Sequence, residues 1–262
     1  MITLLKLGGS LITDKNTPHT LRADVIHRLA KEIKSAWKTE HMPLIIGHGS
    51  GSFGHVPAKK YGTRSGVHST TEWRGFAEVH SEATALNRMV TDILREEGLP
   101  ILSFVPMDNI RTDDGKVTGW DITPILQCLS NHLIPLIFGD TVFDTTRGGT
   151  ILSTEDLFLY LANIIDEPNR ILLAGLEQGI WENFPERTHL VKEIAADSPD
   201  NSNILGSAST DVTGGMHEKV RLMKKLVSEG KTESALIFSG EIPGNISCAL
   251  LSEKAIGTMI HN

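Results

Sequence analysis

Cysteine and aromatic residues are scarce in this sequence of 262 residues, which has two cysteines and only 5% aromatic residues. Cys128 and Cys248 lie far apart in the chain, and neither belongs to a Cys-x-x-Cys pair. The pattern therefore gives no support for a zinc site or for dithiol chemistry. We expect two buried free thiols in a reducing compartment. Because no set of His, Cys and Asp residues has the spacing of metal ligands, we expect no metal held by protein side chains alone.

The sequence also lacks a surplus of basic residues and any long apolar run. Its formal net charge of −7 argues against a general nucleic-acid-binding protein, which normally has a basic face. A few local lysines can still bind a small anion. No uninterrupted apolar run is long enough to span a membrane, and the N-terminal stretch, broken by Gly8-Gly9, has no signal-peptide core. We therefore expect a cytoplasmic protein that binds neither nucleic acid nor membrane.

Two well-known nucleotide-binding motifs are missing. Neither glycine-rich stretch of the chain ends in the Gly-Lys-Ser/Thr of a P-loop. Gly49-x-Gly51-x-x-Gly54 matches the dinucleotide pattern, but no acidic residue follows a second strand roughly 20 residues further on. We do not expect this stretch to open a helix in the dinucleotide manner. A Gly-x-Ser-x-Gly elbow is also absent, so the nucleophile chemistry of a hydrolase is unsupported.

What the chain does contain is a regular alternation of strands and helices. Continuous apolar runs predict strands at 3–7, 43–47, 101–105, 134–138, 171–174, 235–239 and 257–260. Apolar residues at helical spacing, with Asp121 and Thr154 as caps, predict helices at about 22–38, 72–97, 121–130, 154–165, 215–229 and 245–251. A hairpin is expected at 109–120 and an extended loop at 183–210. Such strands are typical of a mostly parallel sheet covered on both faces, in which ligands bind beyond the carboxyl ends of strands.

The first of these strands contains a lysine and ends in a glycine pair. Lys6 lies among apolar residues, where an unpaired ammonium group is costly to bury. A phosphate would pair with it, Gly8 and Gly9 would supply backbone donors, and Lys15 could fold back to the same anion. The alternative is that Lys6 extends to solvent near a strand edge.

The stretch Gly47 to His55 follows the second strand and contains three glycines within six residues, Gly49, Gly51 and Gly54. Glycines allow a backbone turn with positive φ, and successive N–H groups in such a turn can converge on an anion. The alternative is a flexible surface turn.

Two further stretches place charged residues at the start of a helix. Lys219 lies one turn into the helix that follows Asp211 to Gly214. It is near enough to reach an anion bound at the N-terminus of that helix. The alternative is a helix cap followed by an exposed lysine. In Ser153 to Asp156, a carboxylate can hold two lysines, bind Mg²⁺ through water or only cap the helix. Lys59-Lys60 are expected at the surface, and His80 is expected to be a half-buried histidine with a polar partner.

Together, and in this order, these stretches resemble the amino acid kinase family. The resemblance runs from Lys6 to the Gly240-x-x-Pro243-Gly244-Asn245-Ile246 segment, and its most specific part is Ser52-Phe53-Gly54-His55. This ending is similar to that of family members that phosphorylate isopentenyl phosphate or fosfomycin. The resemblance implies an α/β open αβα sandwich and a homodimer. It also implies one kinase domain over 1–262, with an acceptor-binding lobe at roughly 1–168 and a nucleotide-binding lobe at 169–262.

The resemblance also implies ATP as phosphoryl donor, Mg²⁺, and a role for each matched residue. Lys6 would neutralise the transferring phosphoryl group, Lys15 and Lys219 would contact the ATP phosphates, and Asp156 would organise the lysines. His55 would bind the acceptor phosphate and orient it for in-line attack. Close donors to ATP would come from Gly8, Gly9, Ser10, Gly51 and Gly215, and the acceptor site would be lined by Ser50 and Gly139.

The chain departs from the family pattern at two places. The family usually has three consecutive glycines where this chain has Gly49-Ser50-Gly51, and an Asp-Gly-Val-Tyr stretch where it has Glu177-Gln178-Gly179-Ile180-Trp181. In the family the second stretch helps to shape the nucleotide-binding side of the site. The resemblance therefore predicts the contacts to the ATP phosphates better than the contacts to the nucleoside.

Three functions are compatible with these motifs. The first is ATP-dependent phosphorylation of isopentenyl phosphate to the diphosphate. An apolar stripe on the helix at 72–97 would then hold the prenyl chain, through Phe76, Val79, Ala83 and Leu86. The second is a kinase for another small phosphate or phosphonate, such as fosfomycin. The third, an inactive nucleotide-binding regulatory protein, is disfavoured by the joint presence of the lysines and His55.

Overall fold

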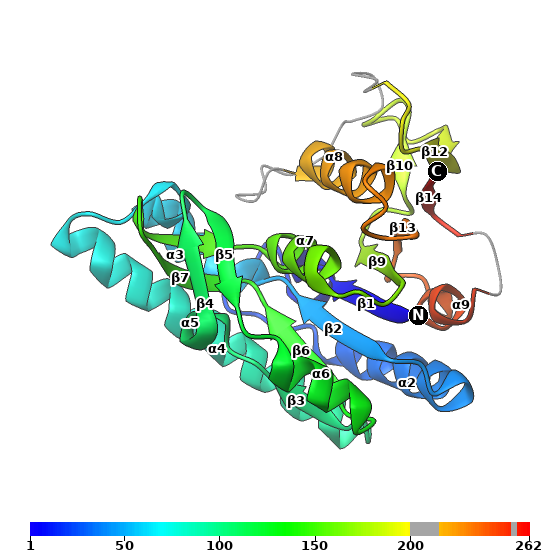
Figure 1. The fold of residues 1–262 in the computed structure, drawn as a ribbon, viewed down its shortest axis with the longest axis horizontal. Coiled ribbons are helices and arrows are strands. Elements are labelled where there is room, and N and C mark those ends of the chain that lie inside the picture. The colour runs from blue at the N-terminus through cyan, green and yellow to red at the C-terminus, as the bar shows by residue number, and fades with distance from the viewer. Residues whose placement is uncertain (200–214, 253–255) are drawn as a thin grey trace.

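The computed structural model describes residues 1–199, 215–252 and 256–262, and these are built around one central sheet (Figure 1). Its neighbouring strands are parallel except for the antiparallel pair formed by β13 and β14. The mostly parallel sheet is therefore confirmed. The eight strands, in spatial order, are β12 (Glu193–Ala195), β14 (Thr258–His261), β13 (Ser234–Ser239), β9 (Asn169–Gly175), β1 (Ile2–Leu7), β2 (Leu44–His48), β6 (Ile134–Phe138) and β3 (Ile101–Ser103).

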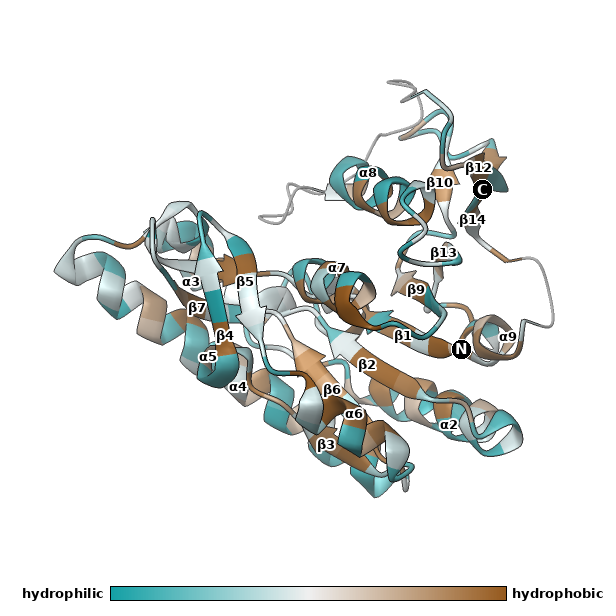
Figure 2. Ribbon diagram, in the orientation of Figure 1, coloured by the Kyte–Doolittle hydropathy of each residue, from teal (hydrophilic) through white to brown (hydrophobic). Residues whose placement is uncertain are grey.

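Helices cover both faces of this sheet, as expected for an open αβα sandwich (Figures 1 and 2). One face is covered by α2 (Ala23–Glu40), α4 (Thr70–Glu96) and α9 (Asn245–Leu251). The other is covered mainly by α7 (Thr154–Ile164) and α8 (Gly215–Ser228), with α6 (Thr123–Ser130) beside them. None of the helices in the described ranges is both long enough and apolar enough to cross a membrane.

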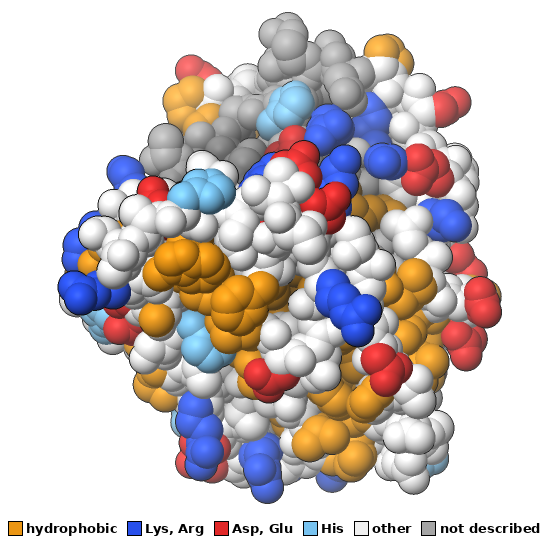
Figure 3. Space-filling model, turned by 60° about the vertical axis from the view of Figure 1, so that its left-hand side comes forward, with side chains coloured by type: hydrophobic (Ala, Val, Ile, Leu, Met, Phe, Trp, Pro, Cys, Tyr) orange, Lys and Arg blue, Asp and Glu red, His pale blue; other side chains and the backbone are white. Residues whose placement is uncertain are grey.

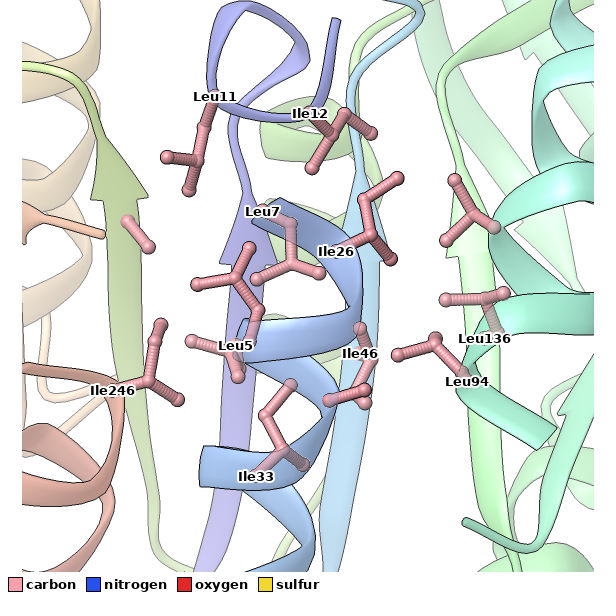
Figure 4. Packing of buried hydrophobic residues seen from close by; sticks show 14 of the residues in the cluster. Leu5, Leu7, Leu11, Ile12, Ile26, Ile33, Ile46, Leu94, Leu136 and Ile246 are labelled. Carbon is pink, nitrogen blue, oxygen red and sulfur yellow. The ribbon is translucent and has the colours of Figure 1, made fainter. Parts of the chain in front are cut away.

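Strand β1 shows how the two cores fix the direction of the functional lysine. Leu5 and Leu7 pack on the side of α2, where Figure 4 shows them facing Ile33 and its neighbours. Ile2 and Leu4 belong to the opposite core, which contains side chains of α7 and α8. Successive side chains of a strand point to opposite faces. Lys6 therefore shares the face of Leu4 and is directed toward α7.

A second, four-stranded sheet stands beside the first, in the order β5-β4-β7-β8. Its strands are β4 (Ile110–Asp113), β5 (Lys116–Trp120), β7 (Asp140–Asp144) and β8 (Gly148–Leu152). The expected hairpin at 109–120 is confirmed, and both Asp114 and Gly115 have positive φ, at 47° and 75°. Strand β3 is shorter than predicted and is followed by the short helix α5 (Pro106–Asn109), which begins at a proline.

The main differences lie in the glycine-rich stretches, where helices replace the expected turns. Gly51 has a φ of 49° and opens α3 (Gly51–Tyr61), where the sequence predicts only a turn. A four-residue helix, α1 (Gly9–Ile12), follows the first glycine pair. Helix α3 contains Gly54 and Pro57, residues of low helix propensity, so the sequence gives little sign of it.

Short strands also occur in the predicted loop region. Strands β11 (Leu190–Val191) and β12 lie within 183–210. Strand β11 pairs with β10 (Ile180–Trp181), which precedes this predicted loop in the chain. Residues 200–210 of the predicted loop lie outside the described residues.

Candidate active site

A cleft lies at the carboxyl ends of β1, β2, β6 and β9, where parallel α/β sheets usually bind ligands. The residues predicted to be catalytic or to contact the two phosphates line this cleft, with the exception of Asp156. They are Lys6, Gly8, Gly9, Ser10, Lys15, Ser50, Gly51, His55, Gly139, Gly215 and Lys219. Residues separated by more than 200 positions in the chain therefore share one surface.

The floor of the cleft is formed where the two glycine stretches meet backbone to backbone. A Cβ atom on Gly9 would overlap the backbone nitrogen of Gly51, and a Cβ atom on Gly51 would overlap the Thr13 hydroxyl. Gly51 also needs the positive φ that glycine adopts readily. Only glycine fits at these two positions, which explains why both stretches are glycine-rich.

Helix N-termini at the cleft make it attractive to anions. Helices α3, α7 and α8 begin at Gly51, Thr154 and Gly215, and all three residues line the cleft. The first turn of a helix has unpaired N–H groups and the positive end of the helix dipole. These are the features that bind phosphate at helix N-termini. The Asp211–Gly214 part of the third predicted motif lies outside the described residues.

A buried carboxylate joins two of the three lysines. Lys6, 7% exposed, forms an ion pair with Glu155, which is 4% exposed. The ammonium nitrogen of Lys219 lies 3.6 Å from the other carboxylate oxygen of Glu155. Lys15 lines the same cleft from an exposed position. Glu155 thus holds the lysines of β1 and α8 on either side of one negative charge.

This arrangement corrects the prediction that Asp156 organises the lysines. Ser153 is the N-cap of α7, its hydroxyl oxygen accepts from the Asp156 N–H at 3.1 Å, and Asp156 in turn accepts from the Ser153 N–H at 2.7 Å. Asp156 also contacts Arg64, at 3.3 Å. The capping box holds Asp156 at the helix end, and Glu155, one position earlier and about 100° around the helix, faces β1 instead. The residues alone left both carboxylates of Ser153 to Asp156 open, and the family resemblance assigned the role to Asp156. The expected cap at Thr154 lies one residue after the observed N-cap, Ser153.

The lysines also decide the charge of Glu155. Burial alone would raise the pKa of this carboxyl group, but the ammonium groups of Lys6 and Lys219 outweigh burial and bring the pKa down to about 2. Glu155 is therefore ionised at neutral pH. Within the described residues, this one carboxylate therefore lies between two lysines that line the cleft.

The residues predicted to bind the acceptor come from the start of α3 and from the end of β6. Ser50 is the N-cap of α3, and His55 lies just over one turn into the same helix. Both line the cleft with Gly139, the residue after β6. The three residues predicted to bind the acceptor, Ser50, His55 and Gly139, therefore all line this cleft.

His48 joins three cleft segments and was not singled out from the sequence. It is fully buried at the end of β2, and its ring stacks on Phe138 with centroids 5.6 Å apart. Its carbonyl oxygen accepts from the Thr154 hydroxyl at 2.6 Å and from the Gly139 N–H at 3.2 Å. Burial lowers the pKa of His48, so the imidazole is neutral. A histidine at the end of an otherwise apolar strand is the one signal that the sequence offers for it.

Several secondary expectations also have an outcome. His80 is half-buried and lies 3.0 Å from a carboxylate oxygen of Asp140, so its polar partner is confirmed. Lys59 and Lys60 are exposed. Both cysteines are free; Cys128 is buried, which raises its pKa to about 11, whereas Cys248 is only partly buried.

The fold and the cleft define a class of protein: an α/β protein that places lysines, glycine backbones and helix N-termini around one site. Residues 1–239 match the family model described as "Amino acid kinase family". The chain belongs to the amino acid kinase family.

Proteins similar to this chain carry a more specific name. The isopentenyl phosphate kinase of Methanocaldococcus jannaschii is 32% identical, over 97% of this chain and 96% of the relative. That of Methanothermobacter thermautotrophicus is 33% identical over 98% of both chains. A solved structure described as "X-ray structures of isopentenyl phosphate kinase" superposes with a TM-score of 0.80 at 29% identity, covering 99% of this chain and 100% of the other.

Proposed function

We propose that this protein is an ATP-dependent kinase that phosphorylates isopentenyl phosphate to isopentenyl diphosphate, in isoprenoid biosynthesis. The observation that carries the proposal is the single cleft in which Lys6, Lys15, Lys219 and His55 converge around glycine backbones. The full-length similarity to isopentenyl phosphate kinases supports the choice of acceptor.

The chemistry needs positioning and positive charge more than a strong base. A phosphate monoester is largely ionised near neutral pH, so one of its oxygens can attack the γ-phosphorus of ATP directly. The new bond joins that oxygen to the γ-phosphorus, and the bond to the bridging oxygen of ADP breaks in line with it. The two reactants are anions that repel each other, and oriented donors and cations overcome this repulsion.

Each cleft residue has a role in this scheme. Lys6 neutralises the transferring phosphoryl group, while Lys15 and Lys219 contact the ATP phosphates. Glu155 is a positioning residue, because it holds Lys6 and Lys219 in place. His55 donates a hydrogen bond from its imidazole N–H to the acceptor phosphate.

The backbone completes the scheme on both sides of the reaction. Donors to ATP come from Gly8, Gly9, Ser10, Gly51 and Gly215, and the acceptor side is lined by Ser50 and Gly139. In this proposal residues 169–262 form most of the nucleotide-binding lobe. Residues 1–168 supply the acceptor side, and they also contribute Lys6 and the Gly8-Gly9 pair to the ATP phosphates.

We propose that Mg²⁺ enters with ATP and is held chiefly by its phosphates, as is usual for this ion. The side chains fit this arrangement, because no group of three or more His, Cys, Asp or Glu residues within the described ranges could hold a metal ion. Bound Mg²⁺ would spread positive charge over the phosphates.

The proposed place for the prenyl chain differs from the sequence-based hypothesis. Phe76, Val79, Ala83 and Leu86 are buried in α4, and none of these four described side chains lines the cleft. The apolar lining close to Gly139 is instead formed by Ile151 and Leu152 of β8. We propose that the prenyl chain lies against β8.

A homodimer formed through the β3 edge of the sheet is also proposed. Leu102 of β3 is 47% exposed, and Leu126 and Leu133 nearby in the chain are also exposed apolar side chains. Figure 3 shows a different face, on which hydrophobic side chains also gather. Light scattering after size exclusion tests the dimer, with Leu102→Lys expected to shift it toward monomer; a wild-type monomer would contradict it.

A cytoplasmic location remains a prediction, tested by fractionation of cells that express the full chain.

A coupled ADP-release assay tests the proposed function. The acceptors are isopentenyl phosphate, dimethylallyl phosphate, longer prenyl phosphates and fosfomycin, each with ATP and Mg²⁺. We expect the highest kcat/KM for a short prenyl phosphate. A preference for fosfomycin would replace this function with a phosphonate kinase, and no turnover with any acceptor would favour an inactive nucleotide-binding protein.

A further inference from the structure

The Thr13 side chain bridges the two glycine stretches that form the floor of the cleft. It follows α1 and is 1% exposed. Its hydroxyl donates to the Gly9 carbonyl oxygen at 2.8 Å and accepts from the Ser52 N–H at 2.9 Å. One hydroxyl therefore bonds to the stretch after β1 and to the first turn of α3, 39 residues further on.

The surroundings fix Thr13 in this position. Its own N–H also donates to the Gly9 carbonyl oxygen, at 2.9 Å, and its backbone pairs with Leu21 in an isolated bridge. Its side chain packs directly against Gly51, where any Cβ atom would overlap it. The Ser52 N–H lies in the first turn of α3, where N–H groups have no partner within the helix, so the threonine satisfies a donor that the helix cannot.

We infer that Thr13 is a positioning residue that sets the spacing between the donor phosphates and the acceptor phosphate. This inference rests on the proposed function, in which Gly8 to Ser10 contact ATP while Ser50 and His55 contact the acceptor. Thr13 does not itself line the cleft, so it acts through the two segments that it joins. Reacting atoms must lie about 3–3.5 Å apart, and a misplacement of about 1 Å can cost roughly 100-fold in rate.

A purely structural role makes a different prediction. Loss of any buried hydroxyl lowers stability, because its former partners are left without a hydrogen bond. Loss of a hydroxyl with only a structural role would not lower kcat of the folded protein. A positioning role predicts a fall in kcat with little change in KM, because each substrate still binds to its own segment.

The experiment compares Thr13→Val, which keeps the shape and removes the hydroxyl, with Thr13→Ser, which keeps the hydroxyl. Thr232→Val is the matched control, because Thr232 is 3% exposed and its hydroxyl donates to the Asn169 carbonyl oxygen at 2.9 Å, away from the cleft. We expect Thr13→Val to lower kcat by about 10- to 100-fold, with both KM values within about threefold of wild type. Thr13→Ser is expected to restore most of kcat, and Thr232→Val to lose stability without losing kcat.

A second measurement does not depend on activity. Hydrogen exchange of the Ser52 amide is expected to be faster in Thr13→Val than in wild type and slow again in Thr13→Ser. If Thr13→Val does not fold, Thr13→Ala is used for both measurements with the same expectation. An unchanged kcat in a folded hydroxyl-free variant, or equal losses in Thr13→Val and Thr232→Val, would overturn the inference. An inactive wild type would instead overturn the proposed function.

Discussion

At the scale of single residues, Glu155 is the buried carboxylate that joins two of the cleft lysines. It is an ionised carboxylate in the protein interior, and it remains so because Lys6 and Lys219 lie beside it. Removal of one partner from a buried ion pair is much more costly than removal of an exposed charge, because the remaining charge is left unpaired. Asp156 is adjacent in sequence and belongs to the helix cap, which makes the two acids a natural pair of test positions.

Glu155→Gln is expected to lower stability by about 3 kcal/mol, since it removes one charged partner of a buried ion pair. It should also lower kcat by about tenfold or more, because Lys6 and Lys219 lose the group that holds them. Asp156→Asn is expected to cost only about 1 kcal/mol, through the helix cap, and to keep most of kcat. Urea unfolding and steady-state kinetics of both variants provide the check; a greater loss of kcat in Asp156→Asn would restore Asp156 as the organising residue.

The depressed pKa of Glu155 also gives a dependence of stability on pH. A carboxyl group with a pKa of about 2 in the folded protein and about 4.5 when unfolded contributes stability above pH 4.5, and loses it as the pH falls toward 2. The stability difference between wild type and Glu155→Gln is thus expected to be constant above about pH 5 and to shrink below it. Denaturant unfolding at a series of pH values measures this, and a constant difference down to pH 3 would exclude the depressed pKa.

His55→Ala is expected to lower kcat by about 10²- to 10³-fold, the usual effect of removing one donor to a reacting oxyanion. ATP should still bind, because its proposed contacts lie on the lysines and the glycine backbones. Calorimetry with ATP and turnover with isopentenyl phosphate separate the two effects. Lys59→Ala, an exposed change on the same helix, is the control. Normal turnover by His55→Ala would remove His55 from the site.

At the scale of elements, α4 is attached to β7 by the contact between His80 and Asp140. The hydrogen bond to Asp140 raises the pKa of His80, while burial raises the pKa of Asp140. Asp140 directly follows Gly139, which lines the cleft. The contact therefore connects the long helix to the acceptor side of the site.

Because the folded pKa of His80 is raised, its contribution to stability is complete below the unfolded value of about 6.5 and is lost as the pH rises through the folded value. Wild type is expected to exceed His80→Gln by up to about 1 kcal/mol near pH 6, and by less near pH 8.5. Urea unfolding at both values tests this. An advantage that grew with pH would show that His80 is neutral in the folded protein.

The elements also show which features the sequence could predict. Strands such as β6 were recognised with the correct ends, because a strand buried on both faces is a continuous apolar run. Helix α3 was missed because its glycines and proline hide the helical pattern, and its contacts with α4 and with the first glycine stretch stabilise it instead. The stretch Ser153 to Asp156 was recognised as able to hold two lysines, but its local pattern does not show which of its two carboxylates faces β1. Thr13 was missed because its partner Ser52 is distant in sequence, and contacts of that kind leave no local pattern.

At the scale of the whole molecule, an acidic chain gathers lysines at one edge of its sheet. The net charge is −7, yet Lys6, Lys15 and Lys219 converge on one cleft. Parallel strands make this possible, because the segments after β1, β2, β6 and β9 all emerge at the same edge. The two glycine stretches, joined by Thr13, bring the proposed donor and acceptor phosphates together there.

Phosphorus NMR of the reaction mixture tests this central claim most directly. Purified protein is mixed with ATP, Mg²⁺ and isopentenyl phosphate, and the acceptor phosphorus is followed with time. We predict that its single monoester resonance is replaced by the two coupled resonances of a diphosphate, in step with the formation of ADP. Formation of ADP and inorganic phosphate with the monoester unchanged would contradict transfer between two phosphates in this cleft.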